Sequence, residues 1–130
     1  MTIDLYYLAL SAVLCLVLWV PYVMARFGIW GIVETMGYPD NPPTLPGWAG
    51  RAERAHRNMV ENLVPFTALV LVAHVAGLSN HLTALGCAIF FWSRVAHAIV
   101  YMLGIPWART LTFMASWVGS LMVFFAILGV

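Results

Sequence analysis

The residues best suited to chemistry gather in one short stretch, RAERAHRNMVEN, which begins at residue 51. The chain has only six basic and five acidic side chains among its 130 residues, and five of them fall here. On an α-helix Arg54, Asn58 and Glu61 are spaced i, i+4 and i+7, so they share one face, with Arg51 and Arg57 beside it. Arginine carries a planar fork of donors that suits carboxylate or phosphate groups. The pattern therefore predicts an anion-binding face in which Glu61 could also hold a cation.

A second polar face lies in a later apolar stretch, where Arg94, His97 and Tyr101 are spaced i, i+3 and i+7. An ionisable side chain at the centre of a membrane-spanning helix costs at least about 2.5 kcal/mol, so it normally faces a bundle interior or a wet cavity. Two interpretations follow. Either these residues form a site, or Glu61 pairs with Arg57 or Arg94 and the pair fixes the helix register. The use of arginine without any lysine favours a site.

Membrane-spanning helices must position these residues. The chain is 63% hydrophobic and 8% charged, whereas about a quarter of the residues of a soluble protein are charged. Four apolar stretches approach the roughly 20 residues that a helix needs to cross about 30 Å of hydrocarbon; they run from Leu5 to Met24, Asn62 to Gly77, Leu82 to Leu103 and Leu111 to Gly129. The alternation typical of barrel strands is missing. We therefore expect an all-α, integral membrane four-helix bundle that forms a single domain over residues 1–130.

The arginines indicate how the chain crosses the membrane. Five of them lie in or beside the first and third connections, namely Arg26, Arg51, Arg54, Arg57 and Arg109. By the positive-inside rule these connections face the cytoplasm, and both termini face away from it. In a bacterium this membrane would be the inner, cytoplasmic one. Residues 27–50, rich in Gly and Pro, are expected to form an interfacial loop anchored by Trp30 and Trp48, with a lid over a substrate as the alternative.

The same topology brings two positive helix ends to the arginines, because the second and fourth helices both begin on the cytoplasmic side. Pro106 suits the first turn of the fourth helix and would leave Arg109 within that turn. The arginines and the two positive helix ends together predict an anion pocket at the cytoplasmic boundary. A small zwitterion with several carboxylates and an amine, together with a lipophilic co-substrate that arrives from the bilayer, would use every element of it.

These residues also carry a family resemblance. The segment ERAHRNMVENLVPF, followed by SRVAHAIVYMLGIPWAR, resembles the MAPEG family, membrane-associated proteins in eicosanoid and glutathione metabolism, and in particular its microsomal glutathione transferase branch. The likeness covers the second to fourth helices, and the first helix only by position. It implies a homotrimer of four-helix subunits that binds glutathione between neighbouring subunits near the cytosolic face.

The resemblance also implies roles for individual residues. Glutathione-binding positions of the family match Arg54, Asn58, Glu61, Arg94 and Tyr101, and Arg109 matches the arginine thought to hold the glutathione thiolate. Arg26 is a further candidate at the end of the first helix, and Arg51 and Arg57 flank the binding face. The chain departs from relatives that carry tyrosine in the third-helix motif, because it has Ala96 followed by His97. A hydrogen bond to glutathione is then either missing or supplied by His97.

The implied function is that of a glutathione transferase or peroxidase in detoxification, in which the arginine-stabilised thiolate of the co-substrate glutathione attacks a lipophilic electrophile or lipid hydroperoxide. Two alternatives stand beside it: a non-catalytic lipid-binding scaffold protein, and a small transporter that uses Glu61, His97 and Arg94 as a charge path. No histidine or cysteine has a partner at the spacing of a metal site, so we expect no metal. Membrane lipid is an expected partner, and nucleic acid is not.

Overall fold

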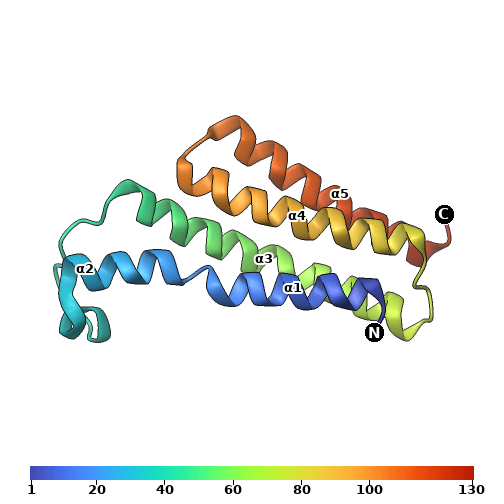
Figure 1. The fold of residues 1–130 in the computed structure, drawn as a ribbon, viewed down its shortest axis with the longest axis horizontal. Helices are drawn as coiled ribbons and strands as arrows, with labels where there is room; N and C mark the ends of the chain where they lie inside the picture. The colour runs from blue at the N-terminus through green and yellow to red at the C-terminus, as the bar shows by residue number, and fades with distance from the viewer.

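The computed structural model describes all residues, 1–130, and they form five α-helices: α1 (Ile3–Val17), α2 (Val20–Met36), α3 (Gly47–Val75), α4 (His81–Leu103) and α5 (Pro106–Leu128). Helices α1 and α2 follow one another end to end and together make one candidate membrane span of 34 residues (Figure 1). With α3, α4 and α5 this gives four helical segments long and apolar enough to cross a membrane. The prediction of an all-α membrane four-helix bundle is confirmed.

The helices run back and forth along one common direction (Figure 1). Both termini and the turn between α3 and α4 lie at one end of the bundle. At the other end lie α2, the beginning of α3, the end of α4 and the beginning of α5. The two polar faces expected from the sequence are on α3 and α4, and the helix order brings their arginine-bearing parts to this second end.

The first connection differs most from its prediction. Only residues 37–46 lie between helices, because α2 continues to Met36 and α3 already begins at Gly47; the expected loop over residues 27–50 is therefore wrong over most of its length. At the start of α2, Tyr22 Oη lies 2.9 Å from His56 Nδ1 and Arg26 lies 3.1 Å from Glu53, and both contacts hold α2 on α3. In the additional helical part, Trp30 donates from Nε1 to the carbonyl of Pro43 at 2.8 Å. Gly31, with φ at 82°, bends α2 instead of ending it.

Two of the four spans are longer than a bilayer requires. At 1.5 Å per residue the 34 residues of α1 and α2 measure about 50 Å and the 29 residues of α3 about 44 Å, against a hydrocarbon layer of about 30 Å. The extra length of α3 is its polar first half, which the prediction of a span from Asn62 left out. This half extends beyond the hydrocarbon layer or tilts within it.

Local signals explain the bounds of α4 and α5. Asn80 caps the start of α4 by accepting the backbone N–H of Leu82 and Thr83, at 2.8 and 3.1 Å. Gly104 ends α4 in the left-handed conformation, with φ at 75°. Pro106 is the first residue of α5, as predicted, because a missing N–H costs nothing in the first turn.

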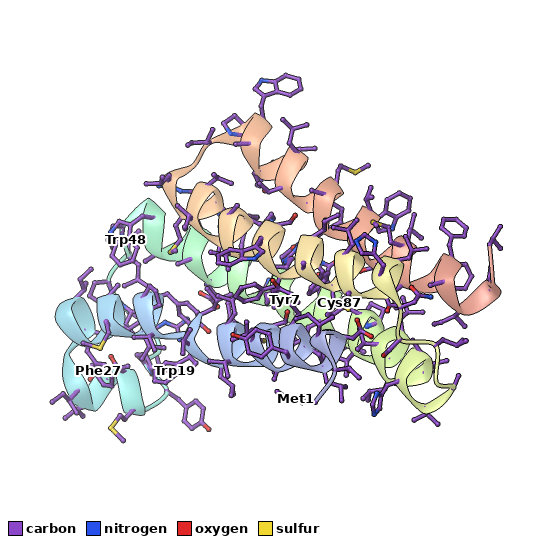
Figure 2. The ribbon with its side chains drawn as sticks, turned by 45° about the vertical axis from the view of Figure 1, so that its right-hand side comes forward. Met1, Tyr7, Trp19, Phe27, Trp48 and Cys87 are labelled. Atoms are coloured by element: carbon purple, nitrogen blue, oxygen red, sulfur yellow. The ribbon has the colours of Figure 1, made fainter.

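The helices pack closely around small and aromatic residues. Phe66 of α3 stacks on Phe90 of α4 with ring centroids 3.7 Å apart. Gly86 and Gly119 let α4 and α5 touch, since a Cβ on either glycine would lie 2.6 Å from the carbonyl oxygen of the other. Tyr7 and Cys87 lie between α1 and α4 (Figure 2), and Cys87 is fully buried. The glycine contact fixes α4 on α5, and with it the relative positions of the polar residues that the two helices carry.

Candidate functional site

A cavity of about 360 Å³ lies among α3, α4 and α5. Its lining residues are Asn58 from α3, His97 and Tyr101 from α4, and Arg109, Thr110 and Phe113 from α5. The structure thus brings together Asn58, His97, Tyr101 and Arg109. The first and last of these residues are more than fifty positions apart in the sequence. The wall combines amide, imidazole, phenol, hydroxyl and guanidinium groups, and it contains no carboxylate.

A smaller cavity of about 100 Å³ shares Tyr101 and Arg109 with the first. Its other polar lining residues are Arg51 and Arg54, and the turn between α4 and α5 completes it. Three guanidinium groups therefore face one small space without a carboxylate among the lining residues. Such a space favours a ligand with carboxylate groups.

Arg109 occupies the first turn of α5, as predicted, and its backbone N–H makes a helical hydrogen bond to the carbonyl of Ile105. Its guanidinium lies 5.2 Å from the centroid of the Tyr101 ring, a cation–π distance, and its side chain is exposed. The positive end of the helix dipole adds to the side-chain charge at this point. Arg109 is therefore free to hold an anion on the cavity wall.

Arg94 lies behind the cavity wall. It is 1% exposed, and it donates from Nη2 to Asn58 Oδ1 at 2.6 Å and from Nη1 to Ser116 Oγ at 3.4 Å. Its Nε has no partner. Because the Asn58 oxygen is taken by Arg94, the Asn58 amide N–H groups remain as donors toward the cavity. Arg94 lines neither cavity and acts on this space through Asn58.

Glu61 lies outside both cavities and is exposed on α3. The proposed ion pairs of Glu61 with Arg57 or Arg94 do not form within the chain. The two ion pairs within the chain both involve Glu53, which lies 3.1 Å from Arg26 and 3.8 Å from Arg57. The carboxylate of Glu61 is left to meet solvent, a ligand or a neighbouring subunit.

The three further candidates have different surroundings. Arg51 donates from Nε to the carbonyl of Met102 at 2.9 Å, so it caps the end of α4 while it lines the smaller cavity. Arg26 lies over the rings of Tyr22 and Trp30, at 5.1 and 5.3 Å, and pairs with Glu53 away from both cavities. Arg57 is exposed and lines neither cavity. The structure thus groups Arg51 with the cavity residues and separates Arg26 and Arg57 from them.

Sequence reasoning did not single out Phe113 and Ser116 of α5. Phe113 lines the larger cavity, and Ser116 accepts from Arg94. A signal was present, because Arg109, Phe113 and Ser116 are spaced i, i+4 and i+7 and so share one helix face. The apolar character of α5 concealed it, since a phenylalanine and a serine within a span are ordinary packing residues.

Fold and cavities define a class of protein: an integral membrane four-helix bundle with an arginine-lined cavity at one end. The sequence profile of the MAPEG family matches residues 6–129, and the chain belongs to this family of membrane proteins of eicosanoid and glutathione metabolism. A comparison with curated proteins and with solved structures finds no match. The membership applies to the family as a whole, and the roles of single residues stay predictions.

Proposed function

We propose that the chain is a glutathione-dependent membrane transferase with peroxidase activity, acting on lipophilic electrophiles and lipid hydroperoxides. The observation that carries the proposal is the convergence of Asn58, His97, Tyr101 and Arg109 on one cavity, with Arg51 and Arg54 in the adjoining one. Glutathione has two carboxylates, an amine and a thiol. The arginines suit the carboxylates and the thiolate, and the amine requires an acidic partner such as Glu61.

Arg109 is proposed to hold the thiolate. A free cysteine thiol has a pKa near 8.5, and lowering the pKa of the bound thiol by about two units needs about 2.7 kcal/mol of preferential stabilisation. A charge-assisted hydrogen bond contributes about 1.5–3 kcal/mol and a helix N-terminus about 0.3–1 kcal/mol. Arg109 at the start of α5 combines both effects. The thiolate then attacks an electrophile that enters from the bilayer.

A homotrimer is part of the proposal. Glu61 and Arg54 are exposed on α3 in a chain that has few charges, and exposure of such groups to lipid is costly. A second copy packed on this face would cover them and bring Glu61 toward the cavity of its neighbour. Native mass spectrometry in mild detergent should show trimers, and monomers that still bind glutathione would contradict an intersubunit site.

The proposed topology has both termini outside the cytoplasm and the cavities facing it. Arginine-bearing connections at one end of the bundle support this orientation under the positive-inside rule. A C-terminal reporter that is active only in the cytoplasm should give no signal. A signal from that reporter would reverse the orientation.

Glutathione titration with detection of the thiolate absorbance band tests the function directly. Purified protein should bind glutathione and develop the band, whereas S-methylglutathione, which has no ionisable thiol, should bind without it. Arg54→Ala and Asn58→Ala should weaken binding. Absence of both binding and band would favour the scaffold alternative, and uptake of a solute into proteoliposomes without a band would favour the transporter.

A further inference from the structure

His97 is a buried side chain whose imidazole has no hydrogen bond to its neighbours. It is 2% exposed, yet it lines the larger cavity. Its ring contacts are aromatic: the centroid lies 5.3 Å from that of Tyr101, in a T-shaped arrangement, and 6.4 Å from that of Phe113. The neighbouring Arg94 donates to Asn58 and Ser116 and makes no bond to the imidazole. A buried imidazole normally has a hydrogen-bond partner, so a ligand in the cavity is the natural partner here.

The other lining groups cannot replace an imidazole as a proton carrier. Arg109 stays protonated, the Asn58 amide does not exchange protons with substrates, and the hydroxyls of Tyr101 and Thr110 are weak acids. Among the lining residues His97 alone carries an imidazole, the side chain that most often takes up and releases a proton during a reaction. Arg109, 5.2 Å from the Tyr101 ring, and the T-shaped contact of His97 with the same ring place an anion-holding group and a proton carrier on one wall.

Resting on the proposed function, we propose that His97 is a catalytic residue that carries the glutathione thiol proton to the leaving oxygen of a hydroperoxide. The cavity-facing nitrogen of His97 takes the proton as the thiolate forms beside Arg109. The thiolate sulfur attacks the terminal peroxide oxygen, an S–O bond forms and the O–O bond breaks. Imidazolium protonates the departing alkoxide, which leaves as an alcohol, and the sulfur is oxidised to a sulfenic acid. A second glutathione condenses with the sulfenic acid to give glutathione disulfide and water.

The charges around His97 favour passing the proton on. Arg94 on α4 and Arg109 on α5 are the charged groups that act on the imidazole. Tyr101 is the other titratable group that lines the cavity, α3 contributes the neutral Asn58, and α1 places the Cys15 thiol near Arg94. Within one subunit no carboxylate lines this cavity to hold an imidazolium in place, and in the proposed trimer the Glu61 carboxylate is taken by the glutathione amine. An added proton therefore meets two cations and moves to the most basic acceptor present, the alkoxide.

The proposal separates two reactions of one thiolate. Alkoxide is a poor leaving group and needs a proton, whereas halide displaced from an activated aromatic ring needs none. His97→Asn keeps a hydrogen-bonding amide but cannot carry a proton. The ratio of hydroperoxide reduction to aromatic halide conjugation should fall by roughly 10²-fold, the usual contribution of general acid catalysis. Added imidazole should restore part of this ratio in His97→Ala, because the enlarged cavity can admit it.

The thiolate band and the thermal stability of each variant serve as controls for glutathione binding and folding. Equal loss of both reactions in His97→Asn would reduce His97 to a positioning role. A wild type that conjugates halides but reduces no hydroperoxide would overturn this inference and the peroxidase part of the proposed function, and it would leave the glutathione transferase part standing. If wild type neither binds glutathione nor forms thiolate, both fail.

Wild type provides a second measurement if the variants do not fold. Proton transfer to the leaving alkoxide predicts a larger solvent deuterium isotope effect on hydroperoxide reduction than on halide conjugation, both measured at saturating glutathione. It also predicts faster reduction of a peroxy acid, whose carboxylate leaves without a proton, after the uncatalysed rate is subtracted. Equal isotope effects and no leaving-group dependence would exclude His97 from proton transfer.

Discussion

Each end of the bundle contains a buried charged side chain, and the surroundings of that side chain differ between the two ends. Where the termini lie, a single anion, Asp4, is 2% exposed and accepts at Oδ2 from Ser79 Oγ at 2.6 Å and Thr83 Oγ1 at 3.1 Å. Asp4 lies in the first turn of α1, and Thr83 lies in the first turn of α4. The carboxylate is therefore close to the positive ends of two helices, which stabilise it without a cationic partner.

At the other end several cations lie together. Arg51, Arg54 and Arg109 line one cavity, and Arg94 lies behind the wall of the next. No carboxylate lines either cavity, and the partners of Arg94 are neutral. Like charges held close together repel one another, and this repulsion is relieved when an anion binds. The Asp4 carboxylate is thus held by hydrogen bonds between helices, whereas the cations at the arginine end are left without anionic partners, as the proposed glutathione site requires.

Among the substitutions at the arginine end, Arg109→Leu should have the largest effect on turnover. Turnover with an aromatic halide should fall about 10²–10³-fold, as on loss of one donor to a developing anion, and should recover partly at higher pH. Glutathione should still bind. A pH titration of thiolate absorbance at saturating glutathione should show a raised thiol pKa in the folded variant. An unshifted titration with unchanged turnover would exclude Arg109 from this role.

Asp4→Asn should affect only stability. Ser79 and Thr83 lose a charged acceptor, and a hydrogen bond to a charged group contributes about 1.5–3 kcal/mol, so the melting temperature in detergent should fall. Glutathione affinity should stay at the wild-type value, because Asp4 is in the first turn of α1 and lines neither of the two arginine-bearing cavities. Asp40→Asn, in the exposed connection before α3, is the matched control and should change neither quantity. Loss of glutathione affinity in Asp4→Asn would show that the two ends are coupled.

The difference between the ends also indicates how much a sequence can predict. The predicted segment Leu82 to Leu103 nearly matches α4 (His81–Leu103), because the apolar run and the helix have almost the same bounds. The helical period alone was enough to place Arg54 with Asn58 on one helix face and Arg94 with His97 on another. These features are local.

Features that depend on long-range contacts were missed. Residues 27–36 of α2 were taken for a loop because their glycines indicate breaks, whereas the helix continues to Met36 and the Trp30 indole within it donates to the carbonyl of Pro43 at 2.8 Å. The place of Arg94 behind Asn58 depends on how α4 is rotated against α3 and α5. Close packing at Gly86 and Gly119 sets part of that rotation, and no periodicity shows it.

Arg94→Met sharpens the contrast with Asp4. The buried guanidinium has no ionic partner, and methionine has a similar reach, so stability should stay the same or rise. Glutathione affinity should fall by roughly tenfold, or about 1.4 kcal/mol, because Asn58 loses the 2.6 Å bond that orients its amide. Calorimetric titration and thermal unfolding measure the two quantities on the same sample. A large drop in melting temperature with normal affinity would make Arg94 a structural residue like Asp4.

Arg57→Ala should have the smallest effect, and its comparison with Arg54→Ala tests whether position or charge count governs binding. Both arginines are exposed on α3, three residues apart, but only Arg54 lines a cavity. Arg57 lies 3.8 Å from Glu53 in an i, i+4 pair and its side chain is 66% exposed, so the pair contributes below about 0.5 kcal/mol. Glutathione affinity should stay within about twofold of wild type in Arg57→Ala and fall by roughly tenfold in Arg54→Ala. Equal losses in the two variants would mean that the net charge of this end attracts glutathione and that the cavity is not the binding site.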